Sequence, residues 1–167
     1  MLAPEILRHH IEYTAWASRR LLDAAAGLTA EQLTRDFATA DKSVVGTLAH
    51  IFAADRIWIG RIQGKPPARF LDRTSEVNLE FLASAWPNVL AEWSAWAAGQ
   101  TAESLAGTLT YSDLKGNQYH QSLWQLVLHV VNHGTHHRGQ ITAALTLLGA
   151  RCPELDLVAM LQQDAAP

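Results

Sequence analysis

The sequence predicts an all-α protein built as a bundle of four long helices. Apolar residues recur at the three- and four-residue spacing of a helix in four segments, and a glycine stands at or just after the end of each. The hydrophobic content of 49% is ample for a core between helices. The four segments are residues 4–26, 43–63, 76–99 and 122–148.

The first half of the chain contains two of these helices. Pro4 suits the first turn of a helix, because a proline there sacrifices no hydrogen bond. Thr29 and Gln32 have the spacing of a capping box and predict a short helical turn, followed by a polar connection to Asp41. The breakers Pro66-Pro67 follow the second long helix and prevent it from continuing.

The second half of the chain contains the other two long helices, with smaller elements between and after them. Residues 64–75 form a connection that, when extended, reaches up to ~40 Å and so crosses the length of a helix. Pro87 lies inside the third helix and predicts a kink near residues 83–86 or a restart at the proline. Alternating residues around a glycine turn predict a small β-hairpin within residues 107–119, and a short last helix is expected at residues 154–163.

Composition limits the classes of function. A chain of 167 residues fits one domain, residues 1–167. The net charge of −3, without a cluster of lysine and arginine, gives no electrostatic basis for binding nucleic acid. The N-terminus lacks the pattern of a signal peptide, and no uncharged run reaches the roughly 18 residues of a membrane span. The single Cys152 excludes an intrachain disulfide, and we expect a cytoplasmic protein.

Histidine is concentrated in one segment of the fourth helix. Four of the eight histidines fall within nine positions: His129, His133, His136 and His137. On a helical wheel they occupy an arc of roughly 100°. The apolar arc of the helix overlaps His133 and His137, which are one turn apart, and leaves His129 and His136 at its rim. Two imidazoles therefore point towards the core.

Two interpretations of the buried pair are open. Each imidazole carries a donor and an acceptor that must be satisfied, and core histidines bonded to neighbouring groups would meet that need. The other interpretation is a divalent metal, because imidazole is the commonest metal ligand and this spacing presents two rings to one ion. A third ligand must then come from another helix. His50 is the candidate, because it lies on a stripe of small and apolar residues that faces a neighbouring helix.

A site of His50, His133 and His137 would hold a metal with three neutral ligands and an open position, as catalytic sites do. The open position attracts an anion, either hydroxide or a thiolate. Zinc, nickel, iron and manganese all accept these ligands. His129 and His136 either orient the ligands from outside or are solvated. No carboxylate is marked as a general base by its spacing, so catalytic residues beyond the metal site are not predicted.

Two arginines lie near these residues on the helical pattern. Arg138 falls within the apolar arc of the fourth helix, which predicts a buried ion pair or a dimer contact. Arg61 shares the stripe of His50, and it either meets an anionic group of a substrate or is solvated above a packed stem.

The histidine motifs resemble those of a known family. The run from His129 to Ile141 resembles the His-x3-His-Arg-Gly-Gln signature of the DinB/YfiT-like metalloenzymes, and the segment from Gly46 to Trp58 resembles that family's second-helix histidine motif. The resemblance implies a four-helix bundle of up-down-down-up topology, often a homodimer, with a divalent metal on three histidines. Characterised relatives include transferases that use small thiols such as bacillithiol or mycothiol, and a mycothiol-dependent isomerase.

Three functions remain as hypotheses. The first is a metal-dependent enzyme that acts on a small-molecule substrate with a low-molecular-weight thiol, as an S-transferase or isomerase. The second is a metal-dependent hydrolase that uses hydroxide and needs no thiol. The third is a stress or binding module in which the ion only stabilises the fold, which a fourth protein ligand would indicate.

Overall fold

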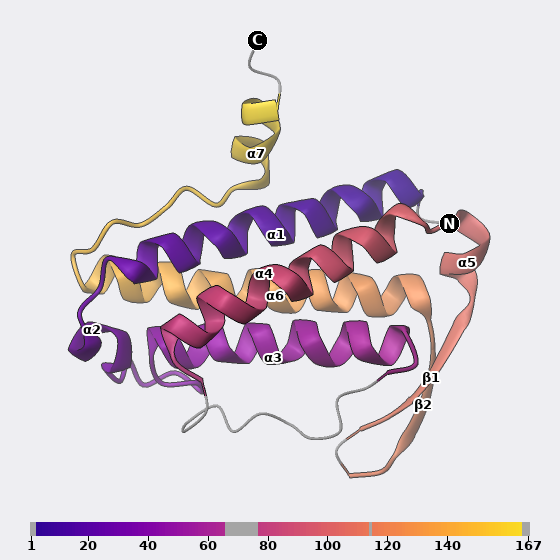
Figure 1. Ribbon diagram of the computed structural model, residues 1–167, viewed down its shortest axis with the longest axis horizontal. Coiled ribbons are helices and arrows are strands. Elements are labelled where there is room, and N and C mark those ends of the chain that lie inside the picture. Colours follow the sequence, from indigo (N-terminus) through magenta and orange to yellow (C-terminus); the bar gives the residue numbers. More distant parts are fainter. Residues whose placement is uncertain (1–2, 66–76, 114, 165–167) are drawn as a thin grey trace.

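The computed structural model describes residues 3–65, 77–113 and 115–164 of the chain. Within these residues it contains seven helices and one two-stranded antiparallel sheet (Figure 1). In chain order the elements are α1 (Pro4–Ala26), α2 (Ala30–Thr34), α3 (Val44–Ile62), α4 (Leu79–Ala98), α5 (Ala102–Ala106), β1 (Thr108–Ser112), β2 (Gln118–Ser122), α6 (Leu123–Leu147) and α7 (Leu157–Asp164).

Four long helices form the predicted bundle. Helices α1 and α3 each pack against both α4 and α6, so that the four surround a common core. Figure 1 shows that α1 and α6 run in one direction and that α3 and α4 run in the other, which is the up-down-down-up topology. Because α3 and α4 run in the same direction, the end of α3 and the start of α4 lie at opposite ends of the bundle. The predicted connection over residues 64–75 lies, after Lys65, outside the described residues.

The core fills the space between the four helices. Its largest fully buried apolar side chains come from α1, α3, α4 and α6, with one from α5: Leu7, Leu21, Leu48, Ile51, Phe52, Ile59, Leu82, Trp86, Leu90, Leu105 and Ile141. Each long helix is thus amphipathic and turns its apolar stripe inwards.

Polar side chains cap the first turn of four helices among the described residues, including α5, where Thr101 and Ser104 form a capping box. The capping box of Thr29 and Gln32 opens α2, and both of its hydrogen bonds are present. The side chain of Ser43 accepts a hydrogen bond from the Gly46 N–H at the start of α3, and Asn78 accepts one from the Phe81 N–H at the start of α4. These caps satisfy backbone donors that have no partner inside the helix.

The predicted boundaries are close to those of the structure, with differences at three elements: α4, α7 and the hairpin. Helix α4 begins at Leu79 rather than at residue 76, and it continues through Pro87 without the restart that was an alternative. The last helix begins at Leu157 rather than at residue 154. The hairpin is confirmed, but its second strand runs to Ser122, beyond the predicted end at residue 119, and leads directly into α6.

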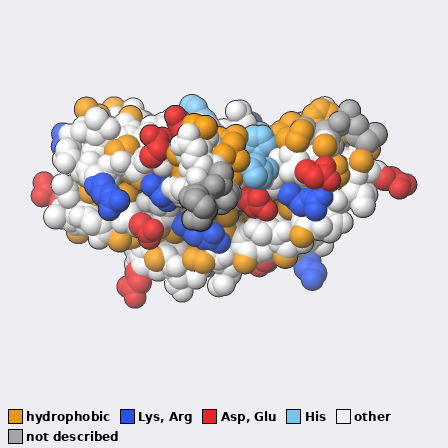
Figure 2. Space-filling view, turned by 90° about the horizontal axis from the view of Figure 1, so that it is seen from above, with side chains coloured by type: hydrophobic (Ala, Val, Ile, Leu, Met, Phe, Trp, Pro, Cys, Tyr) orange, Lys and Arg blue, Asp and Glu red, His pale blue; other side chains and the backbone are white. Residues whose placement is uncertain are grey.

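The surface is mixed in charge, and the described helices are not of membrane type. On the face shown in Figure 2, acidic and basic side chains are interspersed, so that face carries no continuous field of one sign. Among the described residues, no helix combines the length and the apolar character needed to cross a bilayer.

Candidate metal centre

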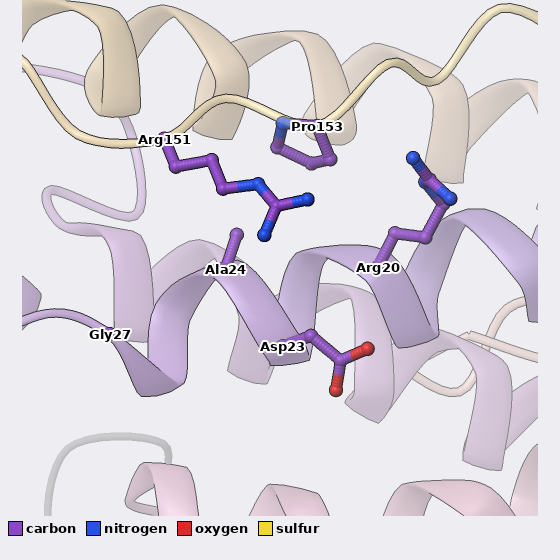
Figure 3. A pocket seen from close by; sticks show the side chains of 6 residues that line it. All are labelled: Arg20, Asp23, Ala24, Gly27, Arg151 and Pro153. Atoms are coloured by element: carbon purple, nitrogen blue, oxygen red, sulfur yellow. The ribbon is translucent and has the colours of Figure 1, made fainter.

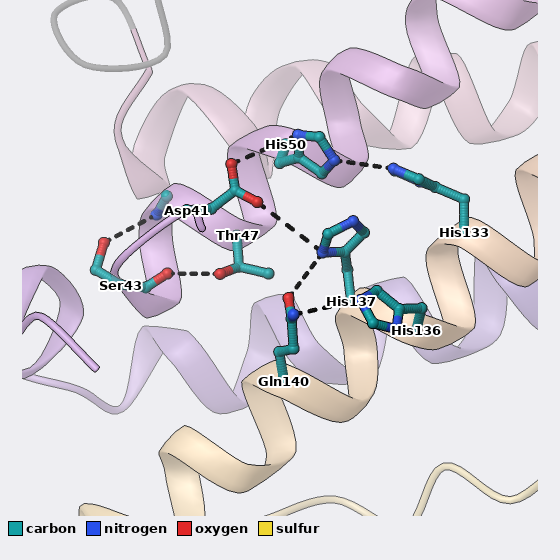
Figure 4. Close-up of polar contacts among 9 residues, drawn as sticks. Asp41, Ser43, Thr47, His50, His133, His136, His137 and Gln140 are labelled. Carbon is teal, nitrogen blue, oxygen red and sulfur yellow. Dashed lines mark hydrogen bonds and ion pairs between the residues drawn. The ribbon is translucent and has the colours of Figure 1, made fainter. Parts of the chain in front are cut away.

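Helices α3 and α6 bring three histidines from distant parts of the chain to one place. His50 lies on α3, and His133 and His137 lie one turn apart on α6. The Nε2 atoms of His50 and His133 are 2.8 Å apart (Figure 4). One ring nitrogen from each of the three residues can be chosen so that all three lie within 4.8 Å of one another. The three imidazoles that the sequence selected therefore form one cluster.

The cluster is electrostatically suited to a cation. The rings of His50 and His133 are half-buried, and that of His137 is nearly buried. Burial, together with repulsion from the neighbouring histidines, chiefly His137 and His50, lowers the pKa of His133 to about 4. A neutral imidazole keeps a lone pair for a ligand, so His133 is ready to bind a metal at neutral pH.

Two side chains contact the outer nitrogens of the cluster. The Nδ1 atom of His137 lies 2.8 Å from Oε1 of Gln140, one turn further along α6. The Nδ1 atom of His50 lies 3.5 Å from Oδ1 of Asp41, in the connection before α3 (Figure 4). Sequence reasoning gave neither residue a role. The spacing of Gln140 from His137 was a usable signal, but no periodicity relates Asp41 to His50.

His129 and His136 lie at the rim, where the helical wheel put them. Both are exposed. The ring of His129 lies 5.9 Å from that of His133, and 5.5 Å from that of Trp58, measured between centroids. Nε2 of His136 lies 3.3 Å from the amide nitrogen of Gln140. Their roles around a metal remain predictions.

Arg61 attaches the hairpin to α3. Its Nη2 atom donates a hydrogen bond of 2.7 Å to the carbonyl oxygen of Ser112, at the end of β1. Its guanidinium lies over the rings of Trp58 and Tyr111, at 4.8 and 5.0 Å from their centroids. A structural role thus accounts for this arginine without a substrate.

Arg138 is buried, but not in the way that was predicted. Its guanidinium lies 5.1 Å from the centre of the Tyr13 ring, and its Nη2 atom donates to Oγ1 of Thr135 at 3.0 Å. Among the described residues no carboxylate lies within ion-pair distance of Arg138, so the predicted ion pair is absent there. The residue is already buried in a single chain, so a dimer contact is not needed to bury it. Gly134 leaves space for the guanidinium of Arg138, because a Cβ at this position would lie 2.8 Å from Nη1.

Two of the cavities that the described residues line lie apart from the histidine cluster and beside α1. One, of about 310 Å³, is lined by Arg20, Asp23, Ala24, Gly27, Arg151 and Pro153 (Figure 3). The other, of about 550 Å³, lies between α1, α6 and the segment before α7, and is lined by His10, Tyr13, Leu128, Val131, Asn132, Thr135, Asp156 and Leu157. Neither includes a residue of the three-histidine cluster.

Comparisons with known proteins agree with this architecture. The sequence profile of the DinB family matches residues 1–165. The chain is 26% identical over 145 residues to "Protein DinB" of Bacillus subtilis strain 168, and the match covers 83% of each protein. A crystal structure of a DinB-like protein from Bacillus cereus ATCC 10987 has a similar fold, with a TM-score of 0.63 and 22% identity, over 86% of this chain and 91% of that one.

Proposed function

Because this chain belongs to the DinB family, we propose that its three-histidine cluster binds a divalent metal ion in a metal-dependent enzyme. The reaction that we propose is an S-transfer or isomerisation that uses a low-molecular-weight thiol. The observation that carries the metal site is the convergence of His50, His133 and His137 from two helices. The thiol chemistry rests on the family resemblance and on the composition of the site.

The distances in the cluster fit a metal after a small adjustment. Metal–imidazole bonds to zinc are about 2.0–2.1 Å long, so two ligands of a tetrahedral ion lie roughly 3.3 Å apart. The Nε2 atoms of His50 and His133 are at 2.8 Å and would have to separate slightly. The widest separation in the cluster, within 4.8 Å, would have to shorten.

The ligand set favours an open site over a closed one. Among the described residues the group consists of three histidines, with no fourth ligand. A divalent cation there would supply Lewis acidity, which favours the thiolate form of a bound thiol over the thiol. The three neutral imidazoles would leave the positive charge of that cation uncompensated by protein anions among the ligands, which favours an anion at the open position. The exposed rim at His129 leaves the cluster accessible from that side.

Elemental analysis of the purified protein tests the metal site and identifies the metal. Zinc, nickel, iron and manganese all accept this ligand set. We expect one equivalent of metal per chain in the wild type and loss of it in His133→Ala. The matched control is His9→Ala, because His9 lies on α1 and pairs with Glu12 instead. Wild-type protein that binds no metal when loaded would contradict the proposal.

The reaction class is tested separately with thiols and an electrophile. We expect the metal-loaded protein to accelerate conjugation of bacillithiol or mycothiol to an aryl halide, and the His133→Ala variant to lose that acceleration. Turnover of ester or amide probes without any thiol would instead support the hydrolase. A protein that binds metal but turns over neither kind of probe would point to the non-catalytic module.

We also propose that the protein is a cytoplasmic homodimer. The free and exposed Cys152 is consistent with a reducing compartment. Helix α7 packs on α1 through Met160 and leaves Val158 and Leu161 exposed, apolar side chains that a second copy would cover. Light scattering after size-exclusion chromatography measures the mass, and a monomer at micromolar concentration would contradict the dimer.

A further inference from the structure

A carboxylate faces the outer side of the histidine cluster. The side chain of Asp41 is only 9% exposed. Its Oδ1 atom is 3.5 Å from Nδ1 of His50, and its Oδ2 atom is 3.9 Å from Nδ1 of His137. Figure 4 shows it between the two rings, on the side away from His133. Removing a carboxylate from water is costly unless other groups compensate for the loss, so its position beside two imidazoles calls for a reason.

The backbone around Asp41 is tightly constrained. Lys42 has a φ of 62°, in the left-handed region that few residues adopt. The Lys42 carbonyl accepts a hydrogen bond of 2.7 Å from the Phe37 N–H, and the Asp41 carbonyl accepts one of 2.7 Å from the Ser43 N–H. A Cβ on Gly46 would lie 2.2 Å from the Asp41 carbonyl oxygen, so only glycine allows this approach. The main chain therefore holds Asp41 against the first turn of α3.

We propose that Asp41 is a positioning residue of the metal site, which orients His50 and supplies the negative charge that the ligands lack. This inference rests on the proposed metal site. A carboxylate beside Nδ1 favours the tautomer with its proton on that nitrogen, which leaves the lone pair on Nε2. Nε2 is the atom of His50 that faces His133. The ring is thus fixed in the tautomer and orientation that binding a cation requires.

Asp41 and Gln140 each lie beside the Nδ1 atom of a different histidine of the cluster. Gln140 contacts Nδ1 of His137 at 2.8 Å and contributes a neutral amide. Asp41 lies nearer to His50 than to His137, and it is charged when ionised. Of these two groups only Asp41 can offset the charge of a divalent ion. Removing it should weaken metal binding more than a change of shape alone would.

The test compares Asp41→Asn with Asp36→Asn in a zinc competition against a chromogenic chelator. Asparagine keeps the size of the side chain and removes its charge. Asp36 lies in the same connection, is exposed, and accepts a hydrogen bond from the Ala38 N–H that an asparagine oxygen can also accept. We expect Asp41→Asn to weaken zinc binding by about 10- to 100-fold, as removal of such outer contacts does elsewhere. Asp36→Asn should bind zinc like the wild type.

A second measurement does not depend on the folding of a variant. Nitrogen-15 NMR of the metal-free wild type distinguishes the two tautomers of each histidine, and we expect His50 to carry its proton on Nδ1. A His50 ring with its proton on Nε2 would overturn the proposal. Equal zinc affinity of Asp41→Asn and wild type would also overturn it while leaving the metal site intact. Failure of the wild type to bind any metal would instead refute the proposed function.

Discussion

Asp55 and Arg138 are the two charged side chains most deeply buried among the described residues. They are 1% and 2% exposed. Two tryptophans of α4 hold Asp55: Trp86 donates its indole N–H to the carboxylate at 2.9 Å, and Trp93 donates to the backbone carbonyl at 3.0 Å. Burial raises the pKa of Asp55 to about 7, against the opposing effects of the Trp86 hydrogen bond and the charge of Arg138. Protonation of the Asp55 carboxyl is therefore coupled to folding, because its pKa differs between the folded and unfolded states.

The raised pKa predicts how stability depends on pH. Between about pH 4 and pH 7 the folded chain holds a proton on Asp55 that the unfolded chain has released, so this group makes the free energy of unfolding fall as pH rises. Asp55→Asn removes the titration and keeps an acceptor for Trp86. Relative to wild type, we expect the variant to gain up to about 1.4 kcal/mol per pH unit across this window.

Urea unfolding followed by tryptophan fluorescence at several pH values measures this difference. The exposed Asp36→Asn variant is the control and should keep the wild-type slope. Parallel pH profiles for Asp55→Asn and wild type would show that the carboxyl has the same pKa in both states.

At the scale of the element, α4 is continuous although it contains a proline. Helix α4 runs from Leu79 to Ala98 with Pro87 in its interior. A proline has no N–H, so the carbonyl of Ala83 lacks its partner within the helix. Packing of Trp86, Leu90 and other residues of its apolar stripe into the core holds the helix together across this position.

We therefore expect Pro87→Ala to stabilise the protein. The substitution restores one backbone hydrogen bond and removes the clash of the proline ring, for a gain of up to about 3 kcal/mol. Chemical denaturation measures the free energy of unfolding, and Asn88→Ala, at the exposed neighbouring position, controls for the general effect of alanine. A less stable Pro87→Ala variant would mean that the ring itself contributes to packing.

The long helices were predictable because the sequence of each helix contains local signals of where it begins and ends. Apolar periodicity, end glycines and caps are local signals, and they predicted α1 and α3 to within one residue at each end. The pair His133 and His137 was visible for the same reason, since one helix sets its spacing. The partnership with His50 required the packing of α3 on α6; the apolar stripe around His50 indicated a buried face, and the family resemblance agreed with the choice. Asp41 was missed because a left-handed residue and a close approach to Gly46 position it, and neither follows a period.

At the scale of the whole molecule, the histidine cluster joins two helices of the bundle. His50 belongs to α3, and its partners belong to α6, which packs against α3 along the core. An ion that binds the folded cluster and not the unfolded chain stabilises the fold by mass action. Metal content and thermal stability should therefore change together.

Thermal unfolding with and without zinc tests this linkage. At a free zinc concentration about 100 times the Kd, we expect a gain of about 2.7 kcal/mol. For a chain of this size, that is an increase in Tm of roughly 5–10 °C. The His133→Ala variant should show no such increase, whereas His9→Ala should match the wild type. An equal shift in both variants would mean that zinc acts elsewhere on the protein.

The separation of 83 positions between His50 and His133 has a consequence for biosynthesis. A nascent polypeptide that has not yet been translated as far as α6 presents one of the three imidazoles alone, and a single imidazole competes poorly with cellular chelators. At the proposed metal site, binding of an ion by all three histidines would therefore have to follow the emergence of α6 from the ribosome.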